Sequence, residues 1–307
     1  MDDVASPSPS PTPANFPIAR ADLIEGLGKG LRLIEAFDNE HPRMTVSEAA
    51  QRTGLTRSAA RRYLLSLCHF GYASSDGKQF WLAPRVLRLG NSFLEGSHTA
   101  RLVQPFIQRI THATGETVNM SVLDSHEVVY IARSSSQRRV SIGYQPGARV
   151  ASHLVTPGVV MLATLTDGAL DAWLAQHEFS AHTPATITDP ALFRSHVLAA
   201  RALGYWVTEA QLDAGLRGVS VVLKDRKGEC KGAVSATLPM QPQTREQLIE
   251  RFVPLLQDCA LSLRPLLKRW LRLPRLTTVF ASKAAAVGQP QFARLRRGAW
   301  TVRAHAQ

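Results

Sequence analysis

The sequence predicts an α+β protein made of two folded parts. Apolar residues recur with the period of a helix between residues 23 and 115, interrupted by one short hairpin pattern. From residue 117 onward the period changes to two, as in strands, and strand and helix patterns then follow one another. With 307 residues, 45% of them hydrophobic, the chain is long enough for about two domains. We therefore expect a small helical domain with a hairpin, a linker helix and a larger α/β domain.

Both ends of the chain differ in composition from the rest. Residues 1–17 are rich in serine and proline, which predicts a disordered arm over 1–22. Ten of the twelve net positive charges fall in residues 264–307, which contain no Asp or Glu. Because only +2 remains elsewhere, the total charge mainly reports a basic C-terminal extension, expected over 274–307. The case for nucleic-acid binding must therefore come from local patterns.

Three short helices are expected after the arm, over 27–38, 45–53 and 57–70. Thr45 and Glu48 have the spacing of a capping box, in which the two side chains cover exposed amides at the start of the second helix. Gly54 then allows a tight turn, and Thr56 is the N-cap of the third helix. Two helices joined by a three-residue turn are typical of a helix-turn-helix.

The third helix has a basic face opposite an apolar one. At 100° per residue its apolar side consists of Ala60, Tyr63, Leu64 and Leu67. Ser58, Arg62 and His69 lie on the opposite side, with Arg57 and Arg61 nearer the flanks, and DNA contact is expected through Arg57, Ser58, Arg61 and Arg62. A hairpin turn at Asp76-Gly77 between β-prone runs adds a wing. Together these signals predict a winged helix-turn-helix over 23–83, although an ordinary helical bundle with solvated arginines remains the alternative for any single arginine.

The rest of the chain is expected to form a linker helix over 84–97 and a second domain over 98–273. The linker helix is also the expected dimer contact, because paired half-sites multiply the small surface that one domain can bury on DNA. Further helices are expected over 102–115, 168–177, 190–203 and 243–270. A loop followed by a helix is expected within 151–165. Strands are expected over 117–123, 128–133, 139–144, 204–210, 218–225 and 229–238.

The motifs of common enzyme and metal sites do not occur in the sequence. It has no GxSxG, HExxH, P-loop or strand-linked GxGxxG pattern, so we expect no enzyme, no cofactor and no metal. His153 is the one histidine expected near a pocket. The three cysteines, Cys68, Cys230 and Cys259, lie far apart and are expected to be reduced core thiols. No apolar run approaches the roughly 18 residues of a membrane span, and no signal peptide is apparent, so a cytoplasmic protein without a membrane partner is expected.

Several of these segments carry a family resemblance. They are the helix-turn-helix run GLRLIEAFDNEHPRMTVSEAAQRTGLTRSAARRYLLSL, the wing GYASSDGKQFWLAPRVLRLG, and the runs GETVNMSVLDSHEVVYIAR, PGARVASH and GLRGVSVVLKDRKG. From about Gly26 to Leu267 the chain resembles the IclR family of bacterial transcriptional regulators. Within that family it resembles the branch that controls aromatic-acid catabolism through the β-ketoadipate pathway.

The resemblance implies a ligand-responsive regulator that binds double-stranded operator DNA as a homodimer or a dimer of dimers. It implies a GAF-like second domain that binds a small carboxylate or aromatic-acid effector. The family's effector site maps here onto Thr156, Pro157, Thr208, Gly218, Ser235 and Thr237. Ser235 and Thr237 are two residues apart, so both would face one side of a strand. Two alternatives remain open: a small-molecule binding module whose DNA-binding role is lost or replaced, and, less favoured, an enzyme fused to a DNA-binding domain.

Overall fold

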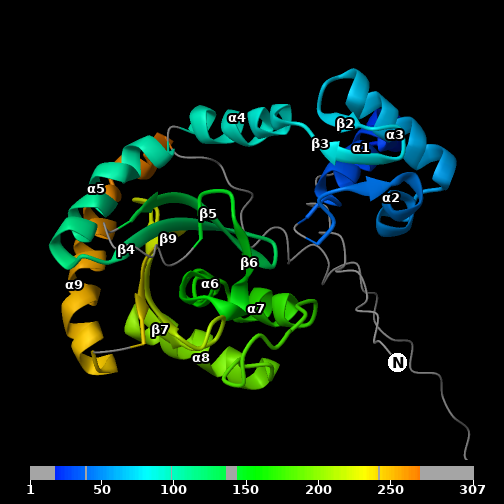
Figure 1. Ribbon diagram of the computed structural model, residues 1–307. Helices are drawn as coiled ribbons and strands as arrows, with labels where there is room; N and C mark the ends of the chain where they lie inside the picture. Colours follow the sequence, from blue (N-terminus) through cyan, green and yellow to red (C-terminus); the bar gives the residue numbers. More distant parts are fainter. Residues whose placement is uncertain (1–17, 39, 98, 136–143, 241–242, 270–307) are drawn as a thin grey trace, which may run out of the picture.

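The computed structural model describes residues 18–38, 40–97, 99–135, 144–240 and 243–269. A small N-terminal domain is joined through one helix to a larger domain built on a curved sheet (Figure 1). Of the arm expected over 1–22, only residues 18–22 are described, and they include a single 3-10 turn at Arg20–Asp22. The basic extension expected over 274–307 lies outside the described residues.

The N-terminal domain is the expected winged helix-turn-helix. Its helices are α1 (Glu25–Glu35), α2 (Val46–Thr53) and α3 (Arg57–His69), and its sheet has the order β1-β3-β2, with β1 at Met44–Thr45, β2 at Ala73–Ser75 and β3 at Gln79–Leu82. The first helix ends three residues earlier than expected. The reason is a side-chain turn in which the Asp38 carboxylate accepts a 2.7 Å hydrogen bond from the His41 amide.

Capping residues fix where the two helices of the motif begin and end. The Thr45 hydroxyl accepts from the Glu48 amide at 3.3 Å, and the Glu48 carboxylate accepts from the Thr45 amide at 2.7 Å, which completes the capping box. Gly54, with φ of +66°, ends α2, and Thr56 caps α3 by accepting from the Ala59 amide at 3.3 Å. These local bonds set the angle between the helices, over a core of Leu33, Met44, Ala49, Leu64 and Phe80.

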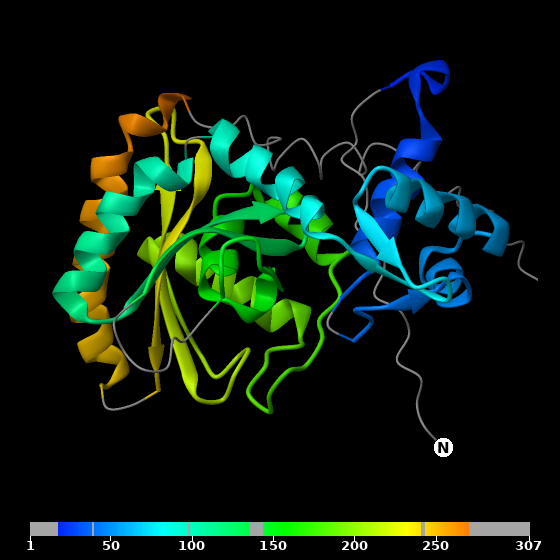
Figure 2. The same ribbon diagram turned by 45° about the horizontal axis from the view of Figure 1, so that its top comes forward.

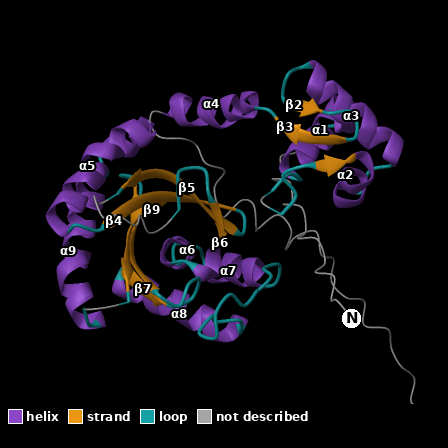
Figure 3. Ribbon diagram, viewed as in Figure 1, coloured by secondary structure: helices purple, strands orange, loops and turns teal. Residues whose placement is uncertain are grey.

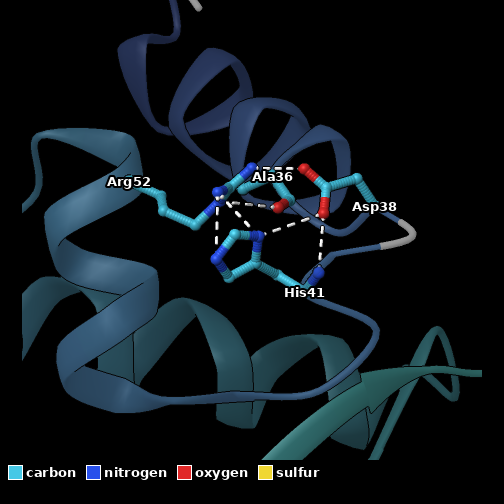
Figure 4. Close-up of polar contacts among 4 residues, drawn as sticks. All are labelled: Ala36, Asp38, His41 and Arg52. Atoms are coloured by element: carbon cyan, nitrogen blue, oxygen red, sulfur yellow. Dashed lines mark hydrogen bonds and ion pairs between the residues drawn. The ribbon is translucent and has the colours of Figure 1, made fainter. Parts of the chain in front are cut away.

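Arg52, in the last turn of α2, ties α1 to the helix-turn-helix (Figure 4). Its Nε donates to the Ala36 carbonyl at 3.1 Å, and Nη2 donates to the Asp38 carboxylate. Its Nη1 also lies 2.9 Å from Nδ1 of His41. One guanidinium thus holds both the carbonyl at the C-terminus of α1 and the turn that follows it.

The larger domain follows a 3-10 turn at Pro84–Val86 and the linker helix α4 (Leu87–Ser97). Its six strands are all antiparallel in the order β6-β5-β4-β9-β8-β7. They are β4 (Thr117–Asp124), β5 (Glu127–Ser134), β6 (Arg149–Ala151), β7 (Tyr205–Glu209), β8 (Leu216–Lys224) and β9 (Cys230–Pro239). The outer face is covered by α5 (Thr99–Thr114) and α9 (Arg245–Leu263), which lie side by side in Figures 1 and 2.

The inner face of the sheet curls around α6 (Thr156–Leu162), which follows a 3-10 turn at Ser152–Leu154 (Figure 3). Helices α7 (Asp167–Leu174) and α8 (Pro190–Leu203) lie on the same side. The two sheet faces differ in chemistry, because Val118, Met120, Val219, Val234 and Ala236 pack toward α5 and α9. Alternation along the strands therefore turns Asn119, Ser121, Ser220 and Ser235 toward α6, and all four are buried.

The third expected strand, 139–144, lies outside the described residues except for Tyr144. The strand that pairs with β5 is Arg149–Ala151, where no strand was expected. Three residues are too few to show a period of two, so sequence patterning cannot find such a strand. The last helix also ends at Leu263 instead of 270, with Pro265 next to its C-cap, and a 3-10 turn follows at Leu266–Arg269.

Candidate functional site

The basic face of α3 is free in solvent. Arg57, Ser58, Arg61 and Arg62 are all exposed, whereas Ala60 and Leu64 are buried and Leu67 is half-buried. Within the described residues, no ion pair or side-chain hydrogen bond occupies the three guanidinium groups, and α3 has no acidic residue. A phosphate or a base edge would therefore meet no competing intramolecular carboxylate on this helix.

The wing beside α3 is held by its turn. The Asp76 carboxylate accepts from the amides of Gln79 at 2.8 Å and Lys78 at 2.9 Å, and these hydrogen bonds lower the pKa of that carboxyl. Gly77 has φ of +95°, which favours glycine at this position. On β3, Trp81 lies under the guanidinium of Arg43, 4.5 Å from the ring centroid.

A cavity of about 490 Å³, measured to its open mouth, lies between the inner face of the sheet and the start of α6. All six residues expected to bind an effector line it: Thr156, Pro157, Thr208, Gly218, Ser235 and Thr237. They come from four separate elements, α6, β7, β8 and β9.

The strand register explains why these positions meet. Thr208 pairs with Gly218, and Gly218 pairs with Thr237, so the three residues form one row across β7, β8 and β9. Above the row, the hydroxyls of Thr156 and Thr208 are hydrogen-bonded at 2.5 Å. A Cβ atom at Gly218 would lie 2.5 Å from the Thr156 hydroxyl, so only glycine leaves room for this pair.

One buried hydroxyl on the cavity has no partner. Ser235 is 2% exposed, and its Oγ makes no hydrogen bond in the described residues. Its cross-strand neighbour Asn119 donates to Thr237 at 3.4 Å, but the amide oxygen of Asn119 is also buried without a partner. Buried polar atoms of this kind cost free energy unless a ligand or water satisfies them.

Aromatic and apolar side chains also line the cavity. Tyr130 and Tyr144 stack with ring centroids 5.6 Å apart, and both line the cavity together with Leu154, Val155, Leu212 and Leu216. Burial raises the pKa of Tyr130, and the neighbouring Tyr144 adds to the effect, so its phenol stays protonated. A flat ring in the cavity would find both aromatic surface and hydroxyl groups.

Of the charged residues near the cavity, Asp213 and Arg217 are among those that line it, whereas Glu209 is not. Alternation along β8 places Arg217 on the face opposite to Gly218, where its Nη1 donates to the Gln243 carbonyl at 2.8 Å. Glu209 pairs with Arg217 at 3.5 Å and with Arg245 at 3.6 Å. The two arginines thereby neutralise the Glu209 carboxylate, and Glu209 does not line the cavity. The sequence alone could not decide whether this side chain faces the cavity.

His153, the histidine expected near a pocket, does not itself line the cavity, although the next residue, Leu154, does. The His153 ring lies against Phe179 and Phe193 instead. Its Nε2 lies 3.0 Å from the Ser180 carbonyl and its Nδ1 lies 2.7 Å from Nε2 of His177. His177 in turn stacks on Trp173, with centroids 4.1 Å apart. Desolvation lowers the pKa of both histidines, that of His177 to about 3.

No group of side chains suited to a metal ion occurs in the described ranges. The same residues contain no helix that is both long and apolar enough to span a membrane. Cys68 and Cys230 are half-buried, Cys259 is buried, and all three are free thiols.

Comparison with known families matches both domains. The model described as "Bacterial transcriptional regulator IclR C-terminal" matches residues 92–264, and the "IclR helix-turn-helix domain" matches residues 26–77. Among curated proteins, a Pca regulon regulatory protein of Pseudomonas putida is 33% identical over 76% of this chain and 81% of its own. The p-hydroxybenzoate hydroxylase transcriptional activator of Acinetobacter baylyi is 35% identical over 81% of this chain and 94% of its own.

Solved structures share the same architecture. A putative transcriptional regulator from Rhodococcus sp. RHA1 has a TM-score of 0.66 and 32% identity, covering 85% of this chain and all of its own. The inducer-binding domain of an Acinetobacter PobR double mutant, solved with 3-hydroxybenzoic acid, has a TM-score of 0.52 and 29% identity. That alignment covers 54% of this chain and 98% of the PobR domain.

Proposed function

The chain belongs to the IclR family of bacterial transcriptional regulators, and we propose that a small hydroxylated aromatic acid, bound in its cavity, controls the binding of operator DNA by α3. The observation that carries the effector half of this proposal is the buried, unpartnered hydroxyl of Ser235 at the cavity wall. Such an atom calls for a polar ligand atom beside it.

The DNA half of the proposal rests on the free basic face of α3. Arg57, Ser58, Arg61 and Arg62 would meet the major groove, where an arginine can donate two hydrogen bonds to a guanine. The wing and the stacked Arg43 would lie along the neighbouring backbone. The domain limits that go with this division of work are 23–83 for DNA binding, 84–97 for the linker and 98–273 for the effector.

The chemistry of the cavity favours an aromatic acid with a hydroxyl group. Thr237 and one of the mutually bonded pair Thr156 and Thr208 can donate hydrogen bonds to a carboxylate, while the unpartnered Ser235 hydroxyl can accept from a ligand hydroxyl. The stacked tyrosines offer a flat apolar surface for the ring between these two groups. The curated activator of p-hydroxybenzoate hydroxylase and the PobR domain bound to 3-hydroxybenzoic acid support the same ligand class.

We further propose a homodimer, or a dimer of dimers, formed in part by the linker helix. Leu89 and Phe93 of α4 are exposed and four residues apart, so they lie on one side of the helix, and exposed apolar surface of this kind marks a site of contact with a partner. A dimer would present two copies of α3 to paired half-sites. The DNA-binding domain, the linker helix and the effector cavity together support a protein that regulates transcription in the cytoplasm and catalyses no reaction.

The effector can act only if it binds the two DNA-binding states of the protein with different affinities. The test is fluorescence anisotropy with a labelled duplex that the full chain selects from a random double-stranded library. We expect 4-hydroxybenzoate to shift the affinity of the protein for this duplex, and adipate to have a much smaller effect.

The combined variant Ser235→Ala, Thr237→Val should abolish the response to 4-hydroxybenzoate while leaving DNA affinity intact. Ser195→Ala, an exposed serine on α8, is the matched control. A double variant that still responds at the wild-type ligand concentration would place the effector elsewhere.

A further inference from the structure

The third turn of α3 carries a large apolar side chain on its exposed face. Leu65 is 43% exposed, although it lies in the middle of a helix whose core side is formed by Ala60 and Leu64. From this we propose that Leu65 reads the operator by packing against the C5-methyl group of a thymine. The proposal rests on the insertion of α3 into the major groove proposed above.

The position of Leu65 on the helix places it among the basic residues. It follows Arg61 by four residues and Arg62 by three, so the three side chains are neighbours on one face. Ser58 lies on the same face seven residues earlier, and His69, also exposed, lies one turn later. Leu65 is thus surrounded by the side chains expected to meet DNA.

Leu65 does not belong to the other exposed apolar surface of this domain. That surface includes Leu27 and Leu31 of α1. Helix α1 packs on the Tyr63 side of α3, since a Cβ added at Gly26 would lie 3.3 Å from the Tyr63 hydroxyl and one at Gly30 would lie 3.9 Å from its ring. Residues 63 and 65 are about 200° apart around the helix, so the two apolar surfaces point in nearly opposite directions.

The chemistry of the major groove leaves one partner for such a side chain. Leucine can neither donate to phosphates nor accept from bases, and the thymine methyl is the apolar feature that base pairs present in this groove. Arg61 and Leu65 are separated by about 6 Å along the helix axis, close to the rise of two base pairs. The thymine should therefore lie within about two base pairs of the base read by Arg61.

The test compares binding sites selected from a random double-stranded library by the wild type and by Leu65→Ala. We expect one A·T position of the wild-type motif to become degenerate in the variant, while the positions read by the arginines persist. In the wild-type consensus, replacing that thymine by deoxyuridine removes only the methyl group. This change should weaken wild-type binding roughly fourfold, the effect of one buried methyl group, and should not affect Leu65→Ala.

Two controls separate the possible outcomes. Leu192→Ala, a leucine of similar exposure on α8, should select the wild-type motif unchanged, and circular dichroism should show that both variants keep their helices. An identical motif for Leu65→Ala, or equal wild-type binding to thymine and deoxyuridine duplexes, would overturn the role of Leu65. If the wild type itself selects no motif, the proposed DNA contact of α3 fails instead.

Discussion

Gly218→Ala should damage the effector cavity with little effect on the rest of the fold. The added Cβ would lie 2.5 Å from the Thr156 hydroxyl and 3.5 Å from that of Thr208, well inside the normal contact distance for the first. Thr156 must then move, which breaks its 2.5 Å hydrogen bond to Thr208. The cavity loses both space and a correctly placed donor.

The size of the effect follows from three contributions. Crowding a packed site costs about 1–3 kcal/mol, and the lost hydrogen bond costs about 0.5–1.5 kcal/mol more. Alanine offsets about 0.5–1 kcal/mol of this by restricting the unfolded backbone. We therefore expect a net destabilisation of roughly 0.5–4 kcal/mol. Losing one hydrogen bond to the effector carboxylate should reduce the binding free energy by about 1.5–3 kcal/mol. This corresponds to a dissociation constant that is roughly 10- to 150-fold higher.

Isothermal titration calorimetry with 4-hydroxybenzoate measures the affinity, and urea denaturation measures the free energy of unfolding. Gly168→Ala is the matched control, because a Cβ at this exposed position of α7 meets no atom within 4 Å. The control should bind 4-hydroxybenzoate like the wild type and unfold at slightly higher urea. Wild-type affinity in Gly218→Ala, despite its lower stability, would refute the assignment of this cavity to the effector.

Four further outcomes are expected. Arg62→Ala should weaken binding to the selected duplex by about 1–3 kcal/mol if the side chain reads a base edge, and unchanged anisotropy curves would contradict the role of this arginine. Arg52→Ala should destabilise the N-terminal domain by about 1–3 kcal/mol in urea, because it removes the bonds to Ala36, Asp38 and His41, whereas an unshifted midpoint would show that the clamp contributes little. In the folded state desolvation lowers the pKa of His177 to about 3, whereas in the unfolded chain this histidine takes up a proton below about pH 6.5. The free energy of unfolding should therefore fall as the pH drops from 6.5 toward 3, and it should fall less steeply in His177→Phe. Parallel pH profiles for wild type and variant would argue against a contribution from His177. Sedimentation should show at least a dimer at micromolar protein, and Phe93→Glu should shift it toward monomer; a monomeric wild type would exclude the α4 contact.

Local signals in the sequence were sufficient for the winged helix-turn-helix. The Thr45 and Glu48 capping box, the turn at Gly54 and the Thr56 cap each involve residues within a few positions of one another. Such bonds form from the chain's own neighbours, so spacing alone predicts them. The α3 faces follow from the helical period for the same reason, with the half-buried Leu67 as the expected variation at the edge of a core.

The effector cavity shows how much a family resemblance adds and what it leaves out. The resemblance pointed to the six lining positions, but not to the wall of Tyr130 and Tyr144, which lies on β5 and on the chain leading to β6. It also gave no orientation for Glu209 or His153. The alternation of Val and Ser along β4, β8 and β9 was visible in the sequence, but the covering of its polar side by α6 was not.

What the sequence by itself determined are the features built from short-range periodicity and capping: the helices, most strands, the basic face of α3 and the shared side of Ser235 and Thr237 on their strand. Only the tertiary structure decided which of these polar groups share one cavity, because Thr156 and Thr208 are 52 positions apart and meet through a sheet that curls around α6. It also decided that Arg217 and Arg245 neutralise Glu209 on the far face, and that Ser235 stays buried without a partner. The physical reason is that burial and charge pairing depend on contacts between residues distant in the chain, and these contacts exist only once the sheet has closed on its helix.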